Sequence, residues 1–378
     1  MNEARVFADG YQKSFARVTE LMEFLKERSK LSFWIRRPTK KLRVMPLVEE
    51  VIEMESDMNW EEIIEDTKKN TELMLKINNQ TYPIRSCALK TILDRAGISG
   101  AALKKLERKD YARIINLCLK EARGDALIKV ADGKVSAVHG GDHNEYSVVE
   151  PETIFAITID YLNVHYPGNQ YIEYSGSYDH VALTAMWELG GQQELLDSYR
   201  EALEEHGLEE RTVVPALRVV TSDVGMSGVN LFPMLLCDSN NRSINLGTPI
   251  KLQHRAGASI HDYQKNLDML YARYQGSVAC LNNLMDTDIS HPLNCLMGIL
   301  KRINISKKIA TEVINLYDAK YGDDPCTAHD LYYALNEAPF VAACNGMQGS
   351  KILAIEENVA RAINLDWEEY DVAGNIKW

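Results

Sequence analysis

The spacing of apolar residues changes several times along the chain, and each change marks a different kind of secondary structure. In the segment 61–77, EEIIEDTKKNTELMLKI, apolar residues recur at the spacing of an amphipathic helix, and Asn59 with Glu62 has the form of a capping box before it. Residues 82–124 predict three short helices punctuated by glycines. The front of the chain is therefore expected to be helical.

At residue 126 the helical spacing gives way to alternation. The segment 126–140, ALIKVADGKVSAVHG, alternates around Asp132-Gly133, and Asp-Gly between alternating apolar residues is a strong hairpin signal. One helix is expected at 147–162, with Pro151 in its first turn, and another at 192–207. Further strand-like runs lie at 170–177, 180–189, 212–223, 228–240 and 243–254. Their short connections favour antiparallel pairing.

From residue 260 the apolar spacing is helical again, with a second capping-box form at Thr327 and Asp330 and a last helix expected from Ser350. The whole pattern predicts the α+β class, with an antiparallel β-sheet in the middle of the chain flanked by N-terminal and C-terminal helical regions. We expect three parts. Residues 1–79 form an N-terminal helical segment with a basic arm and an acidic helix, residues 80–255 form an α+β core with the antiparallel sheet, and residues 256–378 form a C-terminal helical region packed on that core.

The composition is that of a globular protein. Of the 378 residues, 46% are hydrophobic, enough for one large core or two ordinary ones. No apolar run approaches the roughly 18 residues of a spanning helix, and the N-terminus lacks the apolar stretch of a signal peptide, so we expect a cytoplasmic protein without membrane contact. The seven cysteines are scattered singly, which predicts reduced thiols rather than a zinc ribbon or a disulfide framework.

The charge is unevenly distributed along the chain. The net formal charge is −12, yet the segment 26–43, KERSKLSFWIRRPTKKLR, has eight basic residues and one acid, a net +7 that leaves −19 for the rest. Ten acidic residues follow between 49 and 72, and the two blocks could neutralise each other. Alternatively, the basic segment is a phosphate-tracking arm, with Phe33 and Trp34 available to stack on bases. In that interpretation Trp34 stacks and the phosphate contacts are made by Arg36, Arg37, Lys40, Lys41 and Arg43.

The stretch VHGGDHNEY in the middle of the chain is its densest cluster of metal-capable side chains. His139 and His143 are four residues apart with Asp142 between them, a spacing that would bring both imidazoles together on a helix. The two glycines between them oppose a helix, and further ligands would have to come from distant positions such as His165 and His180. We therefore expect a strand-to-helix turn, without a metal or a cofactor.

Two other motifs match known sites only in part. GMQGSK, before the last helix, places Ser350 and Lys351 at a helix N-terminus, where free amides and a cation can bind an anion, but its spacing differs from the Walker pattern. Ser227 in GMSGVN lacks the spacing of a nucleophile elbow. The sequence thus predicts a weak anion site at Ser350 and Lys351 and no catalytic residue.

The order of the segments resembles that of a known family. Over roughly residues 80–370 the chain resembles an uncharacterised phage- and plasmid-like protein family, domain-of-unknown-function family 932. The resemblance rests on four runs in this order: RSCALKTILDRAGIS, INLCLKEARGDALIKVADGKVSAVHGGDHNEYSVVEPETIF, MSGVNLFPMLLCDSNNRSINLG and CTAHDLYYALNEA. The residues from His139 to His143 depart from the usual family pattern, and His254-Arg255 lacks the threonine that usually follows. The resemblance implies a mobile-element origin and supplies no reaction, and the basic segment lies outside it.

Two functions from different classes follow as hypotheses. The first is a phage or mobile-element protein that binds nucleic acid without enzymatic activity, in particular single-stranded DNA during recombination or replication. The alternative is a protein-binding inhibitor of a host defence complex, whose acidic surface contacts a basic partner. A hydrolase or metal-dependent nuclease is disfavoured, because the sequence shows no suitable carboxylate or histidine constellation. Homo-oligomer formation is left open.

Overall fold

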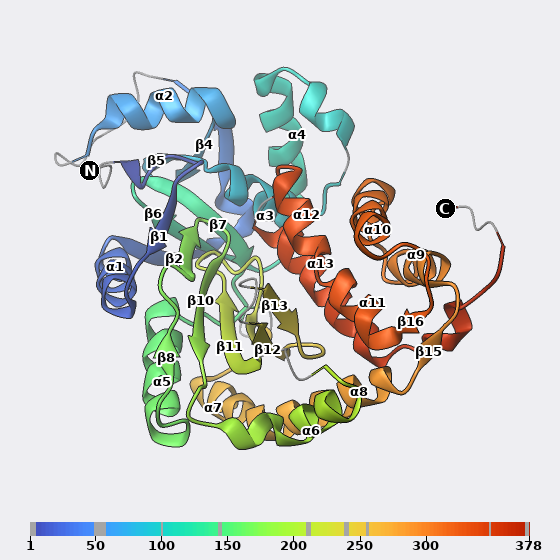
Figure 1. Ribbon diagram of the computed structural model, residues 1–378. Coiled ribbons are helices and arrows are strands. Elements are labelled where there is room, and N and C mark those ends of the chain that lie inside the picture. The colour runs from blue at the N-terminus through green and yellow to red at the C-terminus, as the bar shows by residue number, and fades with distance from the viewer. Residues whose placement is uncertain are drawn as a thin grey trace.

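The structure of the protein is a computed structural model, which describes residues 5–48, 58–99, 101–142, 146–208, 213–237, 242–254, 257–347, 349–374 and 378. Within these ranges antiparallel sheets are combined with many helices, so the fold is α+β, as expected (Figure 1). The α-helices are α1 (Val18–Lys30), α2 (Trp60–Asn70), α3 (Ser86–Ala96), α4 (Arg108–Glu121), α5 (Pro151–His165), α6 (Asp197–Glu205), α7 (Ile260–Asp268), α8 (Leu270–Met285), α9 (Pro292–Arg302), α10 (Lys307–Tyr321), α11 (Ala328–Leu335), α12 (Ala338–Cys344) and α13 (Ser350–Arg361). The strands are β1 (Gln12–Phe15), β2 (Ser32–Pro38), β3 (Arg43–Pro46), β4 (Leu73–Ile77), β5 (Gln80–Pro83), β6 (Asp125–Ala131), β7 (Lys134–Gly140), β8 (Gln170–Tyr171), β9 (Gly176–Asp179), β10 (Leu183–Glu188), β11 (Val213–Thr221), β12 (Val229–Cys237), β13 (Arg242–Asn245), β14 (Ile250–Leu252), β15 (Asp288–Ile289) and β16 (Cys326–Thr327).

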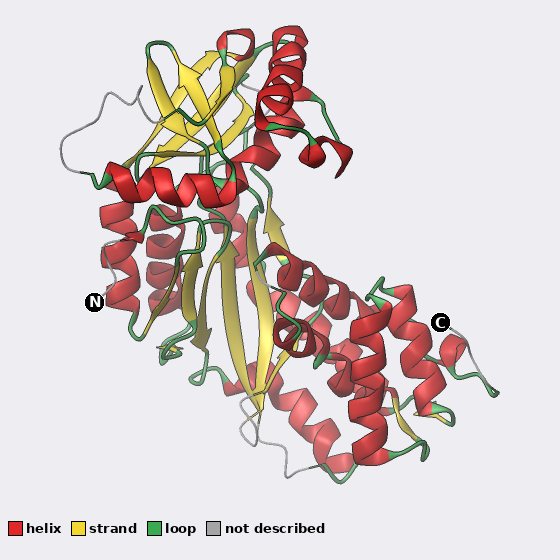
Figure 2. Cartoon of the chain, turned by 90° about the horizontal axis from the view of Figure 1, so that it is seen from above, coloured by secondary structure: helices red, strands yellow, loops and turns green. Residues whose placement is uncertain are grey.

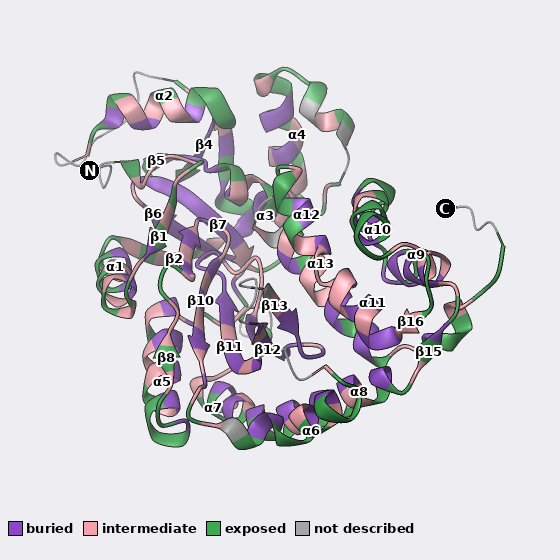
Figure 3. Ribbon diagram, in the orientation of Figure 1, coloured by how far each residue is buried: buried purple, intermediate pink, exposed green. Residues whose placement is uncertain are grey.

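The largest sheet has eight antiparallel strands in the order β1-β9-β10-β11-β12-β13, with β8 paired to β10 and β14 to β12. Alternate residues of β10, Leu183, Ala185 and Trp187, are fully enclosed in the main core, whereas Thr184 and Met186 face the opposite side, as the two-residue period of a strand requires. Helices α1, α5, α7 and α8 contribute to that core and cover the first face of the sheet. Buried residues follow the strands and the inner sides of these helices (Figure 3).

The second face of the central sheet is only partly covered. A small apolar cluster there consists of Ala216, Val220, Phe232 and Met234 from β11 and β12, together with Leu353 of α13. The C-terminal helices pack beside the sheet rather than across all of it (Figures 1 and 2). Part of this face therefore stays open next to α13.

The strands β2 to β7 and the helices α2 to α4 form a small lobe with its own buried apolar cluster (Figure 2). The lobe contains two three-stranded sheets, in the orders β2-β6-β7 and β3-β4-β5. The β6–β7 hairpin confirms the expected turn, because Asp132 and Gly133 both have positive φ, 52° and 72°, as its tight turn requires. The boundaries expected from sequence at residues 79 and 255 do not coincide with the separation between the two apolar clusters.

The expectation of a helical N-terminal segment over residues 1–79 was wrong in part. Its described residues contain the strands β1, β2, β3 and β4 as well as two helices. The helix expected over 61–77 begins as expected after Asn59 but ends at Asn70. Glu72 then takes a positive φ of 56°, and Leu73, Met74, Leu75 and Ile77 are buried in β4 between β3 and β5. Pairing on both edges outweighs the helical spacing of this run.

Among the described residues, no helix is both long enough and apolar enough to cross a membrane. The strands expected at 170–177 and 243–254 are each divided in two, into β8 and β9 and into β13 and β14. Three of the expected helix starts agree with the structure. Pro151 begins α5, the capping box of Thr327 and Asp330 precedes α11, and α13 begins at Ser350. The seven cysteines all lie within the described ranges, and none of them is in a disulfide bond.

Candidate functional site

The basic segment is folded as a strand, a turn and a second strand rather than as an extended arm. β2 pairs with β6 along its whole length, and β3 pairs with β4. The single-turn 3-10 helix η2 (Thr39–Lys41) connects them. Thr39 is buried, its amide donates to the carbonyl of Gly124 (3.1 Å), and its hydroxyl accepts from Nε of Arg95 (3.0 Å). These contacts fix the turn that presents Lys40 and Lys41 to solvent.

A group of exposed cations follows this segment, and we call it the basic strip. Its first members are Arg36, Lys40, Lys41, Arg43 and Lys76. Lys76 on β4 lies directly opposite Arg43 on β3, a like-charge pair that is unfavourable unless an anion or salt screens it. Within the described ranges none of these five side chains forms an ion pair. The strip therefore carries positive charge that the fold itself does not neutralise.

Helix α4 extends the basic strip. Asn116 contacts β3 as a neighbouring strand would, because its Oδ1 accepts from the amide of Val44 (2.8 Å) and its Nδ2 donates to the same residue's carbonyl (2.7 Å). Residues three and four apart share a face of a helix, so Arg113 and Lys120 lie on either side of Asn116, on the face that adjoins β3. Both cations are exposed.

The sequence predicted only the part of the strip between residues 36 and 43. Lys76 was missed because it was assigned to a helix, and Arg113 and Lys120 were missed because nothing local to α4 indicates its neighbour. Arg37, which was predicted to contact phosphate, is half-buried and donates from Nη1 to the carbonyl of Arg36 (2.8 Å).

Trp34 differs from the expectation of a free stacking platform. Its indole N–H donates to Oε1 of Glu150 (3.2 Å), and its ring lies 5.7 Å from that of Tyr146 and 6.3 Å from that of His139. Nζ of Lys129 is 5.4 Å from its centre. Trp34 thus has its contacts inside the protein, whereas the neighbouring Phe33 is 47% exposed.

The stretch VHGGDHNEY connects β7 to α5, as predicted, although His143 lies outside the described residues. His139 stacks on Tyr146 (4.3 Å between ring centres), and Tyr146 stacks in turn on His254 (5.3 Å). Oδ1 of Asp142 accepts from the amide of Asp125 (3.3 Å), on the far end of the hairpin. In the described part of this stretch, Asp142 and His139 therefore have separate partners.

The two distant histidines have other surroundings. His180 is buried beside Arg85, and its Nδ1 forms a hydrogen bond with the hydroxyl group of Tyr178 (3.1 Å). His165 stacks on Tyr161, with 4.2 Å between the ring centres. Among the described residues, no group of three or more His, Cys, Asp or Glu side chains is placed to hold a metal ion.

A network of buried charges joins the small lobe to the central sheet. Asp223, after β11, accepts from Nε of Arg28 on α1 (2.6 Å) and forms an ion pair with Lys129 on β6. Asp132, in the hairpin turn, accepts from Arg28 (2.6 Å) and from Arg85 (3.4 Å). All three cations are at least nine-tenths buried. The network therefore connects α1, β6, the hairpin turn and the loop after β11.

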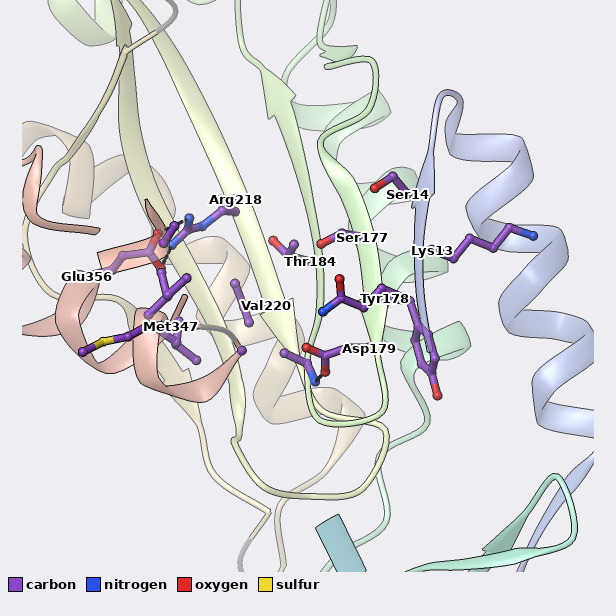
Figure 4. Close-up of a pocket in the computed structure, with 16 residues that line it drawn as sticks. Lys13, Ser14, Ser177, Tyr178, Asp179, Thr184, Arg218, Val220, Met347 and Glu356 are labelled. Carbon is purple, nitrogen blue, oxygen red and sulfur yellow. Dashed lines mark hydrogen bonds and ion pairs between the residues drawn. The ribbon is translucent and has the colours of Figure 1, made fainter. Parts of the chain in front are cut away.

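A groove of about 430 Å³ lies on the open face of the central sheet, next to α13 (Figure 4). Three hydroxyl side chains cross its floor in one row, since Ser177 on β9 is directly opposite both Ser14 on β1 and Thr184 on β10. Val220 on β11 continues the row. The opposite wall is largely aliphatic and includes Ala343, Met347, Ile352 and Leu353.

Charged groups stand at both ends of the groove. At one end Arg218 on β11 forms a two-pronged ion pair with Glu356 on α13 (2.6 and 2.5 Å), above the ring of Phe232. At the other end Oδ1 of Asp179 accepts from the amides of Val181 and Ala182 (2.7 Å each). These contacts fix the positions of both charged ends.

The predicted anion site at Ser350 and Lys351 lies at the edge of this groove. Lys351 is exposed in the first turn of α13. The N-cap residue of this helix is Gly349, which has no side chain that could cap the backbone amides of the first turn. A Cβ at Gly349 would be only 3.2 Å from Oδ2 of Asp179, so a carboxylate of the protein already lies beside this helix N-terminus. The anion site stays a prediction.

Comparison of the chain with family models, with curated protein sequences and with solved structures gives no match. The function is therefore inferred from the geometry of these sites alone.

Proposed function

We propose that this protein binds nucleic acid through the basic strip, without catalysing a reaction. The observation that carries the proposal is the set of exposed cations Arg36, Lys40, Lys41 and Arg43, joined by Lys76 of β4 and by Arg113 and Lys120 of α4. Lys and Arg side chains that lack acidic partners release counterions when they meet phosphates, and this release drives binding.

A single strand is the form of nucleic acid that we propose, in keeping with a role in recombination or replication. The basic strip runs over the strands β2, β3 and β4, the turn η2 and one side of α4, so most of its cations lie on strands and a turn rather than on a helix. Phosphate tracking beside a solvent-exposed aromatic ring is the usual mode of single-strand binding. Phe33 is the exposed aromatic side chain of this segment, whereas Trp34 contacts Glu150, Tyr146 and Lys129 inside the protein.

The test is a fluorescence-anisotropy titration of single- and double-stranded oligonucleotides at low and near-physiological salt. The variant Arg36→Glu/Lys40→Glu/Lys41→Glu/Arg43→Glu, which reverses four exposed cations of the strip, should lose binding. A matched control, Lys301→Glu/Arg302→Glu/Lys307→Glu/Lys308→Glu, reverses four exposed cations on α9 and at the start of α10 and should keep it. Equal losses in both variants would show attraction by total charge alone and would contradict the strip.

A second variant tests the tertiary part of the strip. In the double variant Lys76→Glu/Arg113→Glu, both changed residues lie outside the basic segment of the sequence. This variant should also bind oligonucleotides more weakly, and its affinity should depend less steeply on salt. For a single strand, the slope of log K against log salt should fall by about 0.7 for each phosphate that the variant no longer neutralises. No binding of the wild type at low salt would remove the proposal. Retention of one host protein on the purified chain would then favour the alternative, an inhibitor of a host defence complex.

A further inference from the structure

The groove beside α13 differs in chemistry from the basic strip. Ser14 and Ser177 place hydroxyl groups along its floor, Thr184 continues their row with an Oγ1 that is closed off from solvent, and the opposite wall is aliphatic. Such a surface matches a ligand with one face that forms hydrogen bonds and one flat apolar face. The volume of about 430 Å³ is in the range of small-molecule sites in proteins.

The charges in the groove disfavour an anionic ligand. Arg218 is neutralised by Glu356, and the side chain of Lys13 turns away toward α1, where its Nζ lies 5.1 Å from the ring centre of Phe24 (Figure 4). Among the charged residues that line the groove, Asp179 is thus the one that points into it without an ion pair in the described part of the chain. A phosphate would be placed beside a carboxylate, at a cost that a neutral ligand avoids.

Two polar atoms at the floor have no hydrogen-bond partner within the described ranges. These are Oγ1 of Thr184 and Nε of Arg218, both closed off from solvent. A buried donor without an acceptor costs free energy, so a ligand that draws one of them into a hydrogen bond gains from it.

We propose that this groove binds an uncharged ribonucleoside. The base lies against Val220, Ile352 and Leu353, and its edge reaches Arg218. The ribose hydroxyls lie over the row that contains Ser177 and Thr184 and donate to Oδ2 of Asp179. Carboxylates bind ribose hydroxyls in this way in dinucleotide-binding proteins. An aliphatic wall opposite the hydroxyl row suits a planar heterocycle. Among the described residues that line the groove, the one aromatic side chain, Tyr178, turns away from it, so no ring is available there for the apolar face of a hexose (Figure 4).

The proposal is tested by isothermal titration calorimetry of the full chain with adenosine, guanosine, cytidine and uridine. At least one should bind, its 2′,3′-dideoxy form should bind about tenfold more weakly or worse, and its 5′-monophosphate should also bind more weakly. Free ribose and glucose are the competing sources of a vicinal diol. Either sugar binding as tightly as the nucleoside would overturn the assignment of the base to the aliphatic wall.

Two conservative variants locate the site. Asp179→Asn keeps an oxygen for the amides of Val181 and Ala182 but removes the charge, and Thr184→Val keeps the shape but removes the hydroxyl. Each should weaken nucleoside binding several-fold with an unchanged melting temperature. Thr311→Val, on the exposed side of α10, is the matched control and should change nothing.

Three results would overturn the proposal. These are no heat of binding from any of the four nucleosides at millimolar concentration, affinity unchanged in both groove variants, and tighter binding of the monophosphate. The four-fold charge-reversal variant of the basic strip should bind the nucleoside like the wild type. Loss of oligonucleotide binding with intact nucleoside binding would thus separate this site from the proposed function.

Discussion

Asp223 is enclosed between Arg28 and Lys129, and these contacts join residues that are far apart in the sequence. Burial by itself raises the pKa of a carboxyl group, yet the two cations hold the pKa of Asp223 well below its usual value. A buried charge of this kind is stabilised only while its partners are present. At the scale of single residues, the contact between the small lobe and the central sheet therefore depends on Asp223.

Asp223→Asn should lower the free energy of unfolding by about 3–5 kcal/mol, because it leaves Arg28 and Lys129 buried beside a neutral amide. Urea denaturation followed by circular dichroism measures the change. The same substitution at Asp197, whose ion pair with Arg200 is largely exposed, should cost less than about 1 kcal/mol. Similar costs at the two positions would contradict a stabilising role for the buried network.

The effect of Asp223→Asn should depend on pH with a definite sign. Because the pKa of Asp223 is lower in the folded chain than the value of about 3.9 in an unfolded chain, its stabilisation is complete above that value. It is lost as the pH falls toward the folded pKa. The difference in stability between wild type and variant should be constant from pH 8 to about pH 5 and should shrink below about pH 4. A difference that grows on acidification would contradict this interpretation.

At the scale of elements, α4 illustrates how one side chain can attach a helix to a sheet edge. Asn116 satisfies both the amide and the carbonyl of Val44, two backbone groups that would otherwise lack partners on that edge of β3. The exposed cations of α4 are thereby placed beside those of β3 and η2.

Asn116→Ala should destabilise the chain by about 1–3 kcal/mol, because it leaves both backbone groups of Val44 without their partner. It should also weaken oligonucleotide binding, since α4 would no longer be held in line with the basic strip. Unfolding curves and anisotropy measure the two effects. Asn70→Ala, at the exposed end of α2, is the control and should alter neither. Destabilisation without any change in binding would remove α4 from the interface.

At the scale of the whole molecule, three histidines are placed in surroundings that oppose their protonation. Burial lowers the pKa of His139, of His180 and of His254, and the nearby cation Arg85 lowers that of His180 further. The folded chain therefore binds fewer protons than the unfolded chain just below pH 6.5. The stability is complete above this pH and decreases as the pH falls below it.

The urea midpoint should accordingly be lower at pH 5.5 than at pH 7.5. This window lies above the titration range of Asp223, so the two effects can be measured separately. His254→Gln should reduce the dependence on pH, while the same change at the exposed His261 should leave it as it is. A midpoint that is constant or rises on acidification would contradict the prediction.

The elements that the sequence determined by itself are those controlled by neighbouring residues. The hairpin turn at Asp132-Gly133 follows from two positions with positive φ, α5 begins at Pro151, and the capping box of Thr327 and Asp330 opens α11. Each signal spans four residues or fewer and acts through the local backbone, so it survives whatever surrounds it. Together they were sufficient for the α+β class.

Only the tertiary structure decided how these elements are combined. The run that ends at Ile77 became a strand because β3 and β5 pair with both of its edges, and Trp34 became an internal contact because Glu150 and Tyr146 surround it. The basic strip and the hydroxyl row each draw residues from separate segments. The partners of a strand and the surfaces next to a side chain depend on how the entire core is buried. A local sequence pattern therefore does not predict them.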